Sequence, residues 1–126
     1  RARWTVTVTT SGWLGVGFGG TDIPGTDIVY GSVQNGTPEI FDAKGSDQSD
    51  LTNDTTSNIS NVKGNIINGV LTLSFDRLFD TGDSENDFII PLSDAFDVVW
   101  MFGDTPYTQD STPKKGNASV VVQTPP

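Results

Sequence analysis

The 126-residue sequence contains no cysteine and no histidine. It therefore cannot build a Ser-His-Asp or Cys-His nucleophile, a thiolate or imidazole zinc site, an imidazole-ligated haem or a thiol redox couple. A hard cation such as Ca²⁺ stays open, because carboxylates and carbonyls suffice to bind it. Without disulfides the fold depends on its hydrophobic core, which a chain of this length can supply.

Basic residues are also few, with 7 Lys and Arg against 16 Asp and Glu, a formal charge of −9. Nucleic acids and anionic membranes are bound through Lys and Arg, so we expect neither nucleic-acid binding nor direct membrane insertion. No run of 18 apolar residues is present, and the first ten residues alternate like a strand instead of forming a signal peptide. We expect one domain over residues 1–126, cut from a larger protein.

Four of the asparagines open an N-glycosylation sequon, which hints at a secreted or cell-surface protein. They are Asn35, Asn53, Asn58 and Asn117.

The composition favours β-structure. Asp outnumbers Glu by 14 to 2, and Val plus Ile outnumber Leu plus Ala by 20 to 10. Asp competes with the backbone for hydrogen bonds and so favours turns, whereas β-branched side chains suit a pleated sheet. We therefore expect an all-β domain.

The N-terminal region predicts two antiparallel strands joined by a Ser-Gly turn. Apolar residues alternate with Thr over residues 4–9, and Leu14, Val16 and Phe18 alternate with three glycines. A glycine face weakens a strand unless another backbone, a ring or a ligand packs closely against it, and both close packing and a ligand remain open here.

Further strands are expected at 27–33, 39–43, 59–67, 70–77, 88–91, 96–102 and 118–123. Asn68-Gly69 supplies the two positive φ angles of a type I′ hairpin turn. The polar stretch 45–58 is too long for a hairpin and is either a surface loop or a site. About nine or more strands with regular turns predict an immunoglobulin-like antiparallel β-sandwich.

An ordered set of motifs resembles the DOMON family, which includes the N-terminal domain of dopamine β-monooxygenase and the cytochrome domain of cellobiose dehydrogenase. The motifs are GWLGVGFGG (12–20), GTDIVYGSVQNG (25–36), EIFDAKG (39–45), GVLTLSFDRLFDTGDSENDFII (69–90) and FDVVWMFGD (96–104). The resemblance implies an immunoglobulin-like sandwich. It leaves the function divided among haem cytochromes, sugar-binding modules and ligand-free adhesion domains.

In the cytochrome branch, the resemblance implies a haem-ligating Met in the loop after GxGF and a His after the V-V-W strand. Here Ile23 stands near the methionine's place, and the loop 103–116 has no histidine. Met101 lies inside an apolar strand, as expected of a core residue. We therefore expect no haem ligated in this way.

In the monooxygenase branch, the resemblance implies a cation near the Gly-Trp turn. Asp42 matches one ligand position and Thr26 could offer a carbonyl, but Gly12 replaces a carboxylate. We name Asp22, Asp27, Asp42 and Thr26 as the candidate Ca²⁺ ligands, with Asp47, Asp50 and Asp54 nearby in sequence. Asp27 and Asp42 could equally be structural, orienting loop amides.

A second acidic run, at residues 83–87, is like the first half of a calcium loop but lacks the turn glycine. The alternative is a solvated turn in which Asp80 or Asp83 caps amides and pairs with Arg77.

Aromatic residues supply the candidate sugar-binding positions, since an aromatic face suits the C–H face of a pyranose. We expect Trp100 in the core, whereas Trp13 at a turn and Tyr107 in a loop are freer to bind. The candidate ligand-binding residues are Trp13, Tyr107, Tyr30 and Gln109. For each aromatic residue, packing is the competing explanation.

No acidic pair is set apart by an apolar environment, so we expect no enzyme. The expected function is a non-catalytic extracellular module that binds a ligand, with carbohydrate as the expected ligand class and a cation bracing the first loop. The alternatives are a structural or adhesion module linking neighbouring domains or subunits and, more distantly, an electron-transfer domain.

Overall fold

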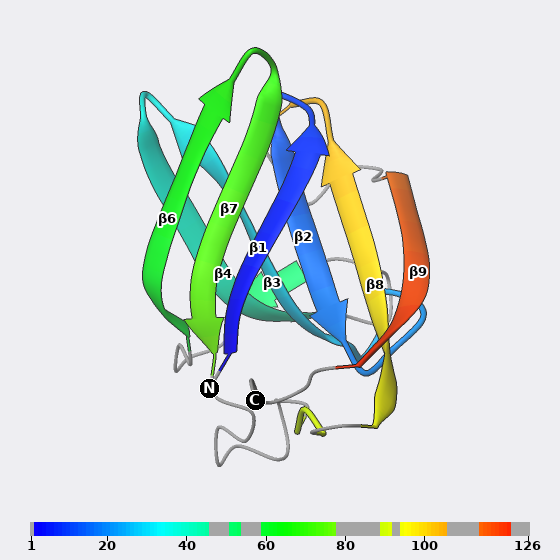
Figure 1. Ribbon diagram of the computed structural model, residues 1–126. Coiled ribbons are helices and arrows are strands. Elements are labelled where there is room, and N and C mark those ends of the chain that lie inside the picture. The colour runs from blue at the N-terminus through cyan, green and yellow to red at the C-terminus, as the bar shows by residue number, and fades with distance from the viewer. Residues whose placement is uncertain are drawn as a thin grey trace.

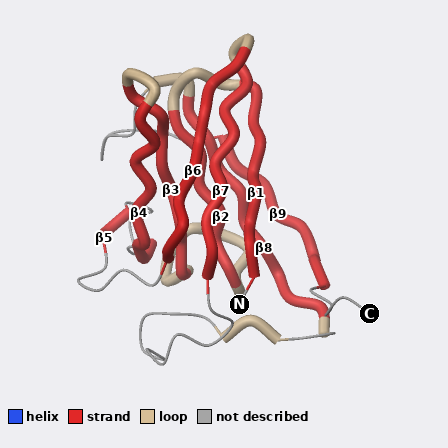
Figure 2. Tube along the Cα trace, turned by 60° about the vertical axis from the view of Figure 1, so that its left-hand side comes forward, coloured by secondary structure: helices blue, strands red, loops and turns tan. Residues whose placement is uncertain are grey.

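The computed structural model describes residues 2–45, 51–53, 59–77, 89–91, 94–105 and 114–121, and all regular structure in these ranges is β-strand (Figures 1 and 2). Eight of the strands have six to nine residues, and the ninth, β5, has three. The strands are β1 (Ala2–Thr9), β2 (Trp13–Phe18), β3 (Asp27–Gln34), β4 (Thr37–Gly45), β5 (Leu51–Asn53), β6 (Ile59–Ile67), β7 (Val70–Arg77), β8 (Ala95–Gly103) and β9 (Lys114–Val121). No helix in these ranges is long and apolar enough to cross a membrane.

The strands form two antiparallel sheets that face each other, which confirms the predicted sandwich. One sheet has the order β1-β7-β6 and the other β5-β4-β3-β2-β8-β9. The interior is filled by side chains that alternate along each strand, as period-2 patterning requires. Leu14, Val16 and Phe18 of β2 pack there against Leu71, Leu73 and Phe75 of β7.

The prediction that the first two strands pair with each other is wrong. β1 pairs with β7 in the smaller sheet, whereas β2 pairs with β3 and β8 in the larger one. The intervening turn carries the chain from one sheet to the other. It is fixed by the Thr10 hydroxyl, which donates to the Gly103 carbonyl and accepts from the Gly12 N–H.

The Asn68-Gly69 hairpin is confirmed, with φ angles of 52° and 76°. Asn35-Gly36 makes the same turn between β3 and β4, with φ angles of 53° and 78°. Positive φ at both central residues matches the twist of the flanking strands, which is why Asn-Gly recurs in such turns.

The largest differences from the predicted strands lie in three regions. Residues 89–91 are not in a strand, and Phe88 lies outside the described residues. The polar stretch 45–58 contains the short strand β5, which pairs with the end of β4. β9 begins at Lys114, four residues before the predicted start. A strand at the edge of a sheet needs no continuous apolar pattern, and both β5 and β9 are edge strands.

Candidate functional site

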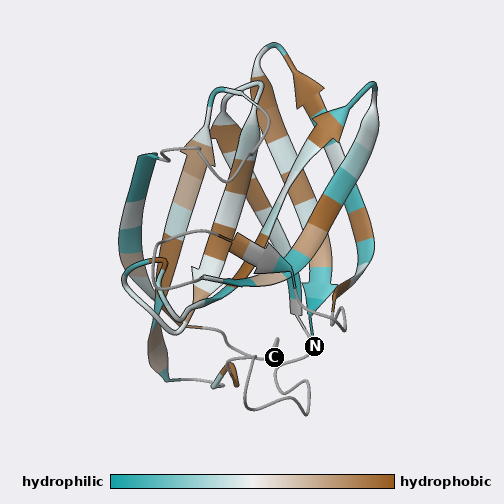
Figure 3. Cartoon of the chain, turned by 180° about the vertical axis from the view of Figure 1, so that it is seen from behind, coloured by the Kyte–Doolittle hydropathy of each residue, from teal (hydrophilic) through white to brown (hydrophobic). Residues whose placement is uncertain are grey.

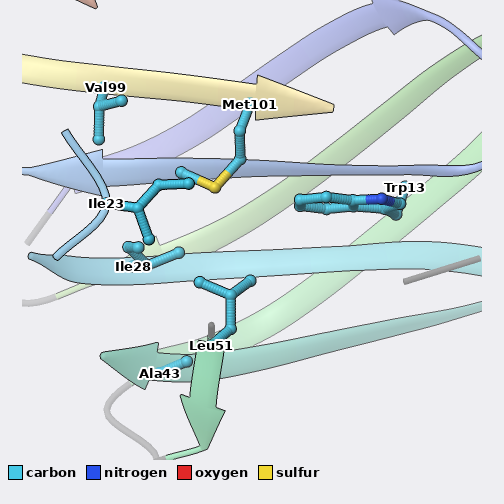
Figure 4. Close-up of a cluster of buried hydrophobic side chains, with 7 residues drawn as sticks. All are labelled: Trp13, Ile23, Ile28, Ala43, Leu51, Val99 and Met101. Atoms are coloured by element: carbon cyan, nitrogen blue, oxygen red, sulfur yellow. The ribbon is translucent and has the colours of Figure 1, made fainter. Parts of the chain in front are cut away.

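The larger sheet carries a second apolar cluster on the face turned away from the smaller sheet. We call it the outer cluster. It consists of Trp13, Ile23, Ile28, Ala43, Leu51, Val99 and Met101, with Tyr30 packed against it. Five strands and a loop contribute these side chains, which Figure 4 shows converging on one space. Figure 3 shows apolar residues alternating with less apolar ones along several strands, and neighbouring positions such as Ile28 and Val29 supply the two faces of this sheet. Because both faces carry buried apolar side chains, every residue of β2 is buried.

The glycine face of β2 leaves space for the side chains of the outer cluster. Gly15 lies between Met101 and Tyr30, and Gly17 between Val99 and Ile28. A methyl group on Gly17 would come within 2.5 Å of Val99 Cγ1. The glycines therefore give room for side chains of the flanking strands to lean across β2. Of the two explanations left open by the sequence, close packing accounts for Gly15 and Gly17.

The loop after β2 folds back over the outer cluster and places Ile23 in it, at 1% exposure. Two backbone hydrogen bonds fasten this loop to the end of β4, from Gly25 N–H to Gly45 O (2.8 Å) and from Gly45 N–H to Thr26 O (2.9 Å). Within the loop, the Thr26 hydroxyl donates to Asp22 O (2.5 Å). Ile23 is thus held in place by main-chain and side-chain contacts on both sides.

Asp22 lies on the surface beside the buried Ile23. Its Oδ1 accepts hydrogen bonds from Lys115 Nζ (2.5 Å) and from the Ile23 N–H (2.8 Å). The Lys115 hydrogen bond, followed by that from Ile23, lowers the pKa of Asp22 below its ordinary value. The pair connects the 19–27 loop to the beginning of β9.

Asp27 points to the other side of the larger sheet and makes a buried ion pair. Its Oδ2 lies 2.6 Å from Arg77 Nη2, and both side chains are at most 3% exposed. Since β3 and β7 belong to different sheets, this pair joins the two layers. The Arg77 guanidinium also lies 5.1 Å from the centre of the Phe18 ring. The predicted partners of Arg77, Asp80 and Asp83, lie outside the described residues, as does the acidic run 83–87.

The candidate cation ligands lie on both faces of the larger sheet. The Thr26 hydroxyl donates to Asp22 O, and the Thr26 carbonyl accepts from the Gly45 N–H. Asp22 is exposed and paired with Lys115, whereas Asp27 is buried and paired with Arg77. Asp42 is buried on β4 beside Val29. No three acidic side chains within the described ranges come close enough together to hold a metal ion. Asp47, Asp50 and Asp54 fall outside those ranges, and Ca²⁺ binding stays a prediction.

Among the candidate ligand-binding residues, Trp13 is 2% exposed and lies edge-on to Tyr30. Its ring therefore belongs to the outer cluster and offers no open face to a sugar. Tyr30 is half-buried, its hydroxyl 2.6 Å from Asn53 Oδ1 and its ring 5.4 Å from that of Phe41. Tyr107 and Gln109 lie outside the described residues.

Trp100 corrects a further prediction, because it is not in the core. Its side chain is 42% exposed, although its neighbours Val99 and Met101 are buried. Trp100 lies on the face of β8 turned toward the smaller sheet, but β8 and β9 extend beyond β1, the last strand of that sheet (Figure 1). The apolar sequence of this strand could not reveal where the facing sheet ends.

Comparison with known families agrees with this architecture. The family model described as "DOMON domain" matches residues 2–103, most of the chain. The chain belongs to the DOMON family. The strand β2 with its glycine face, the loop that carries Ile23 and the long strand β8 all fall within this DOMON match.

One solved structure similar to this DOMON domain is the cytochrome b domain of pyranose dehydrogenase from Coprinopsis cinerea. The TM-score is 0.66 at 16% sequence identity, over 94% of this chain and 66% of that chain. The present chain thus spans just under two thirds of that domain. At this identity the likeness shows the fold alone. A comparison with curated proteins finds no match.

The residues of this DOMON domain do not fit a haem held by methionine and histidine. Ile23 stands near the place that the family resemblance gives to the methionine, and its side chain is packed against the protein itself. Met101 is likewise buried in the outer cluster, and the whole sequence has no histidine. The outer cluster is therefore a packed second core.

Proposed function

We propose that this DOMON domain is a non-catalytic recognition module and that its ligand is a carbohydrate. One observation supports the non-catalytic part of this proposal, namely the packing of the outer cluster. Where the resemblance implies a redox cofactor, the chain places Ile23, Met101 and Trp13, each at most 2% exposed. Apolar side chains supply no acid, base, nucleophile or metal ligand, so this face stabilises the fold without performing chemistry.

The surface supports carbohydrate as the ligand. An exposed aromatic ring accompanies polar side chains where β8 pairs with β9, because Trp100 lies beside Phe102 and Lys114 Nζ lies over the Phe102 ring. An aromatic plane beside hydrogen-bonding groups suits a sugar, which has apolar C–H faces and polar edges. The formal charge of −9 favours neutral glycans over acidic ones, since like charges repel.

A glycan array probed with the chain in calcium, and again in EDTA, tests this proposal. We expect binding to neutral glycans. Binding that disappears in EDTA would point to a cation-dependent site at the acidic residues, and binding that survives would point to stacking on aromatic rings. An array without signal in either buffer would refute the carbohydrate ligand.

A structural role, linking domains or subunits, is the second candidate, and the edge strand β1 favours it. The other edge strands are less suited to pairing with a further strand: β5 has three residues, β9 begins with two lysines, and β6 contains a register shift between Ser60 and Lys63. β1 instead pairs with β7 over eight unbroken positions and contains no proline or glycine. Long regular edges readily accept a further strand. Chemical crosslinking of the chain to a neighbouring domain through β1 would support this role.

We also propose that the protein is secreted or displayed on the cell surface. Asn35 lies exposed at a hairpin tip, and Asn117 lies exposed on β9. Expression in a eukaryotic secretory host should give glycans at these sites, detected as a mass decrease after glycosidase treatment. Absence of glycan at all four sequons would count against secretion.

A further inference from the structure

The part of β8 and β9 that extends beyond β1 carries an aromatic surface. Trp100 and Phe102 lie two residues apart on β8 and therefore on one face. Their ring centroids are 6.2 Å apart and their planes differ by 23°. The two rings form one aromatic patch, which we call the platform; Trp100 is its exposed ring, and Phe102 is half-buried against the core cluster around Leu14.

Small residues on β9 keep the platform flat. Gly116 pairs with Trp100 in register, and Ala118 pairs with Val98 on the same face. A methyl group on Gly116 would come within 2.2 Å of Trp100 Cζ2, so the indole rests on the β9 backbone. One side of the ring is thus supported by the sheet, and with 42% of the residue exposed the ring remains accessible to solvent.

Polar groups stand at one end of the platform. Lys114 Nζ lies 5.6 Å from the centre of the Phe102 ring and 3.8 Å from Asp104 Oδ2. Both charged side chains are about 70% exposed, so they can turn toward a ligand. An ammonium donor and a carboxylate acceptor can together satisfy hydroxyl groups, which both donate and accept.

We infer that this surface, formed by Trp100, Phe102, Gly116, Lys114 and Asp104, binds a neutral polysaccharide with the C–H faces of its sugars stacked on the two rings. The inference rests on the proposed carbohydrate function and names its site and ligand class. The ring spacing of 6.2 Å is close to the length of one sugar unit in an extended chain. Consecutive β-linked pyranoses can therefore lie on the two rings, while Lys114 and Asp104 bind hydroxyl groups at the edge. The −9 charge disfavours polyuronates and sulfated glycans as ligands.

The test uses cellohexaose, chitohexaose and xylohexaose as probes, with polygalacturonate as the acidic comparison, and measures affinity by calorimetry. Trp100→Ala should weaken binding to the preferred probe at least tenfold, and Trp100→Phe should restore part of it. Gly116→Ala should also weaken binding, because its methyl group displaces the indole while both rings remain. Since Trp100 is half-exposed and the indole is a movable side chain, these variants should fold, which circular dichroism and a melting curve verify.

Phe41→Ala is the matched control, since it removes an exposed aromatic residue (39%) from the opposite face of the same sheet. It should bind like the wild type. If Phe41→Ala loses binding while Trp100→Ala keeps it, the site is the Tyr30–Phe41 pair and this inference is wrong. If the wild type binds no probe, the carbohydrate function itself fails. If Trp100→Ala instead converts a dimer into a monomer in light scattering, the platform is a protein interface and the inference is overturned.

Discussion

At the scale of single residues, the buried Asp27–Arg77 pair shows what removing one partner of an ion pair should do. The two charges are almost fully buried, and they join strands of different sheets. Desolvation offsets much of their attraction, so the pair is not a large net source of stability. Removing one side would nevertheless leave the other charge inside the sandwich without this partner.

We therefore expect Asp27→Leu or Arg77→Met alone to lower the free energy of unfolding by about 3 to 5 kcal/mol. The double variant should lose less than either single variant, because neither charge is left buried. Urea denaturation followed by fluorescence measures all three. Lys114→Met is the control, since its ion pair with Asp104 is exposed and should change stability much less. Additive losses in the double variant would contradict this account.

Asp22 gives a prediction about pH. Its pKa is lowered in the folded state by Lys115 and by the Ile23 N–H, so the charged carboxylate favours the folded loop. This contribution is complete above the unfolded value, about 3.8, and is lost as the pH falls through the lower folded pKa. The amide resonance of Ile23, followed by NMR, should titrate with Asp22 below pH 3.8. Lys115→Met should move this transition to higher pH, and an unchanged midpoint would show that the lysine does not hold the carboxylate.

At the scale of elements, sequence patterns predict well where a strand or turn lies and which face of the strand is buried. They predict poorly which strands pair with each other. The Asn68-Gly69 turn is confirmed because two residues determine it. The pairing of the first strand fails, because alternation of Trp4, Val6 and Val8 shows which face is buried but not which strand lies beside it. The prediction that Trp100 lies in the core fails for a related reason. For Trp13 the sequence left packing and binding open, and only the structure shows that the ring is packed, since the exposure of each ring depends on what another part of the chain covers.

The glycine face of β2 leads to a prediction on packing. Gly17→Ala should lower the free energy of unfolding by about 1 to 3 kcal/mol, as overpacking does. Its methyl group would meet Val99 Cγ1 at 2.5 Å and Thr26 Cγ2 at 2.7 Å, both on stiff β-branched side chains. At Gly15 the nearest atoms are 3.1 Å away and one belongs to flexible Met101, so Gly15→Ala should cost less. Thermal unfolding of both variants tests this order, which an equal or reversed loss would contradict.

At the scale of the whole molecule, net charge opposes the tendency of β1 to pair with other chains. The sequence isoelectric point is about 4.1, so repulsion between molecules vanishes near that pH. We expect light scattering to increase as the pH is lowered toward 4.1. Thr7→Lys places a charge on the β1 edge and should suppress this association. Asn65→Lys adds the same charge on β6 and should have less effect, so equal suppression by both variants would show that charge alone decides.

The pairing of β1 with β7 has a consequence for how fast the chain folds. Every partner of β1 lies more than sixty residues further along the sequence, from Val70 to Arg77. The local β6–β7 hairpin can close early. β1 can pair with β7 only after the intervening chain has been brought together, so the entropy of closing this long loop is lost before any contact between β1 and β7 forms. Folding should therefore be slow, on the order of milliseconds to seconds. During that time β7 exposes a strand edge that any passing chain could occupy, so the interval before β1 docks is when this domain depends most on its negative charge.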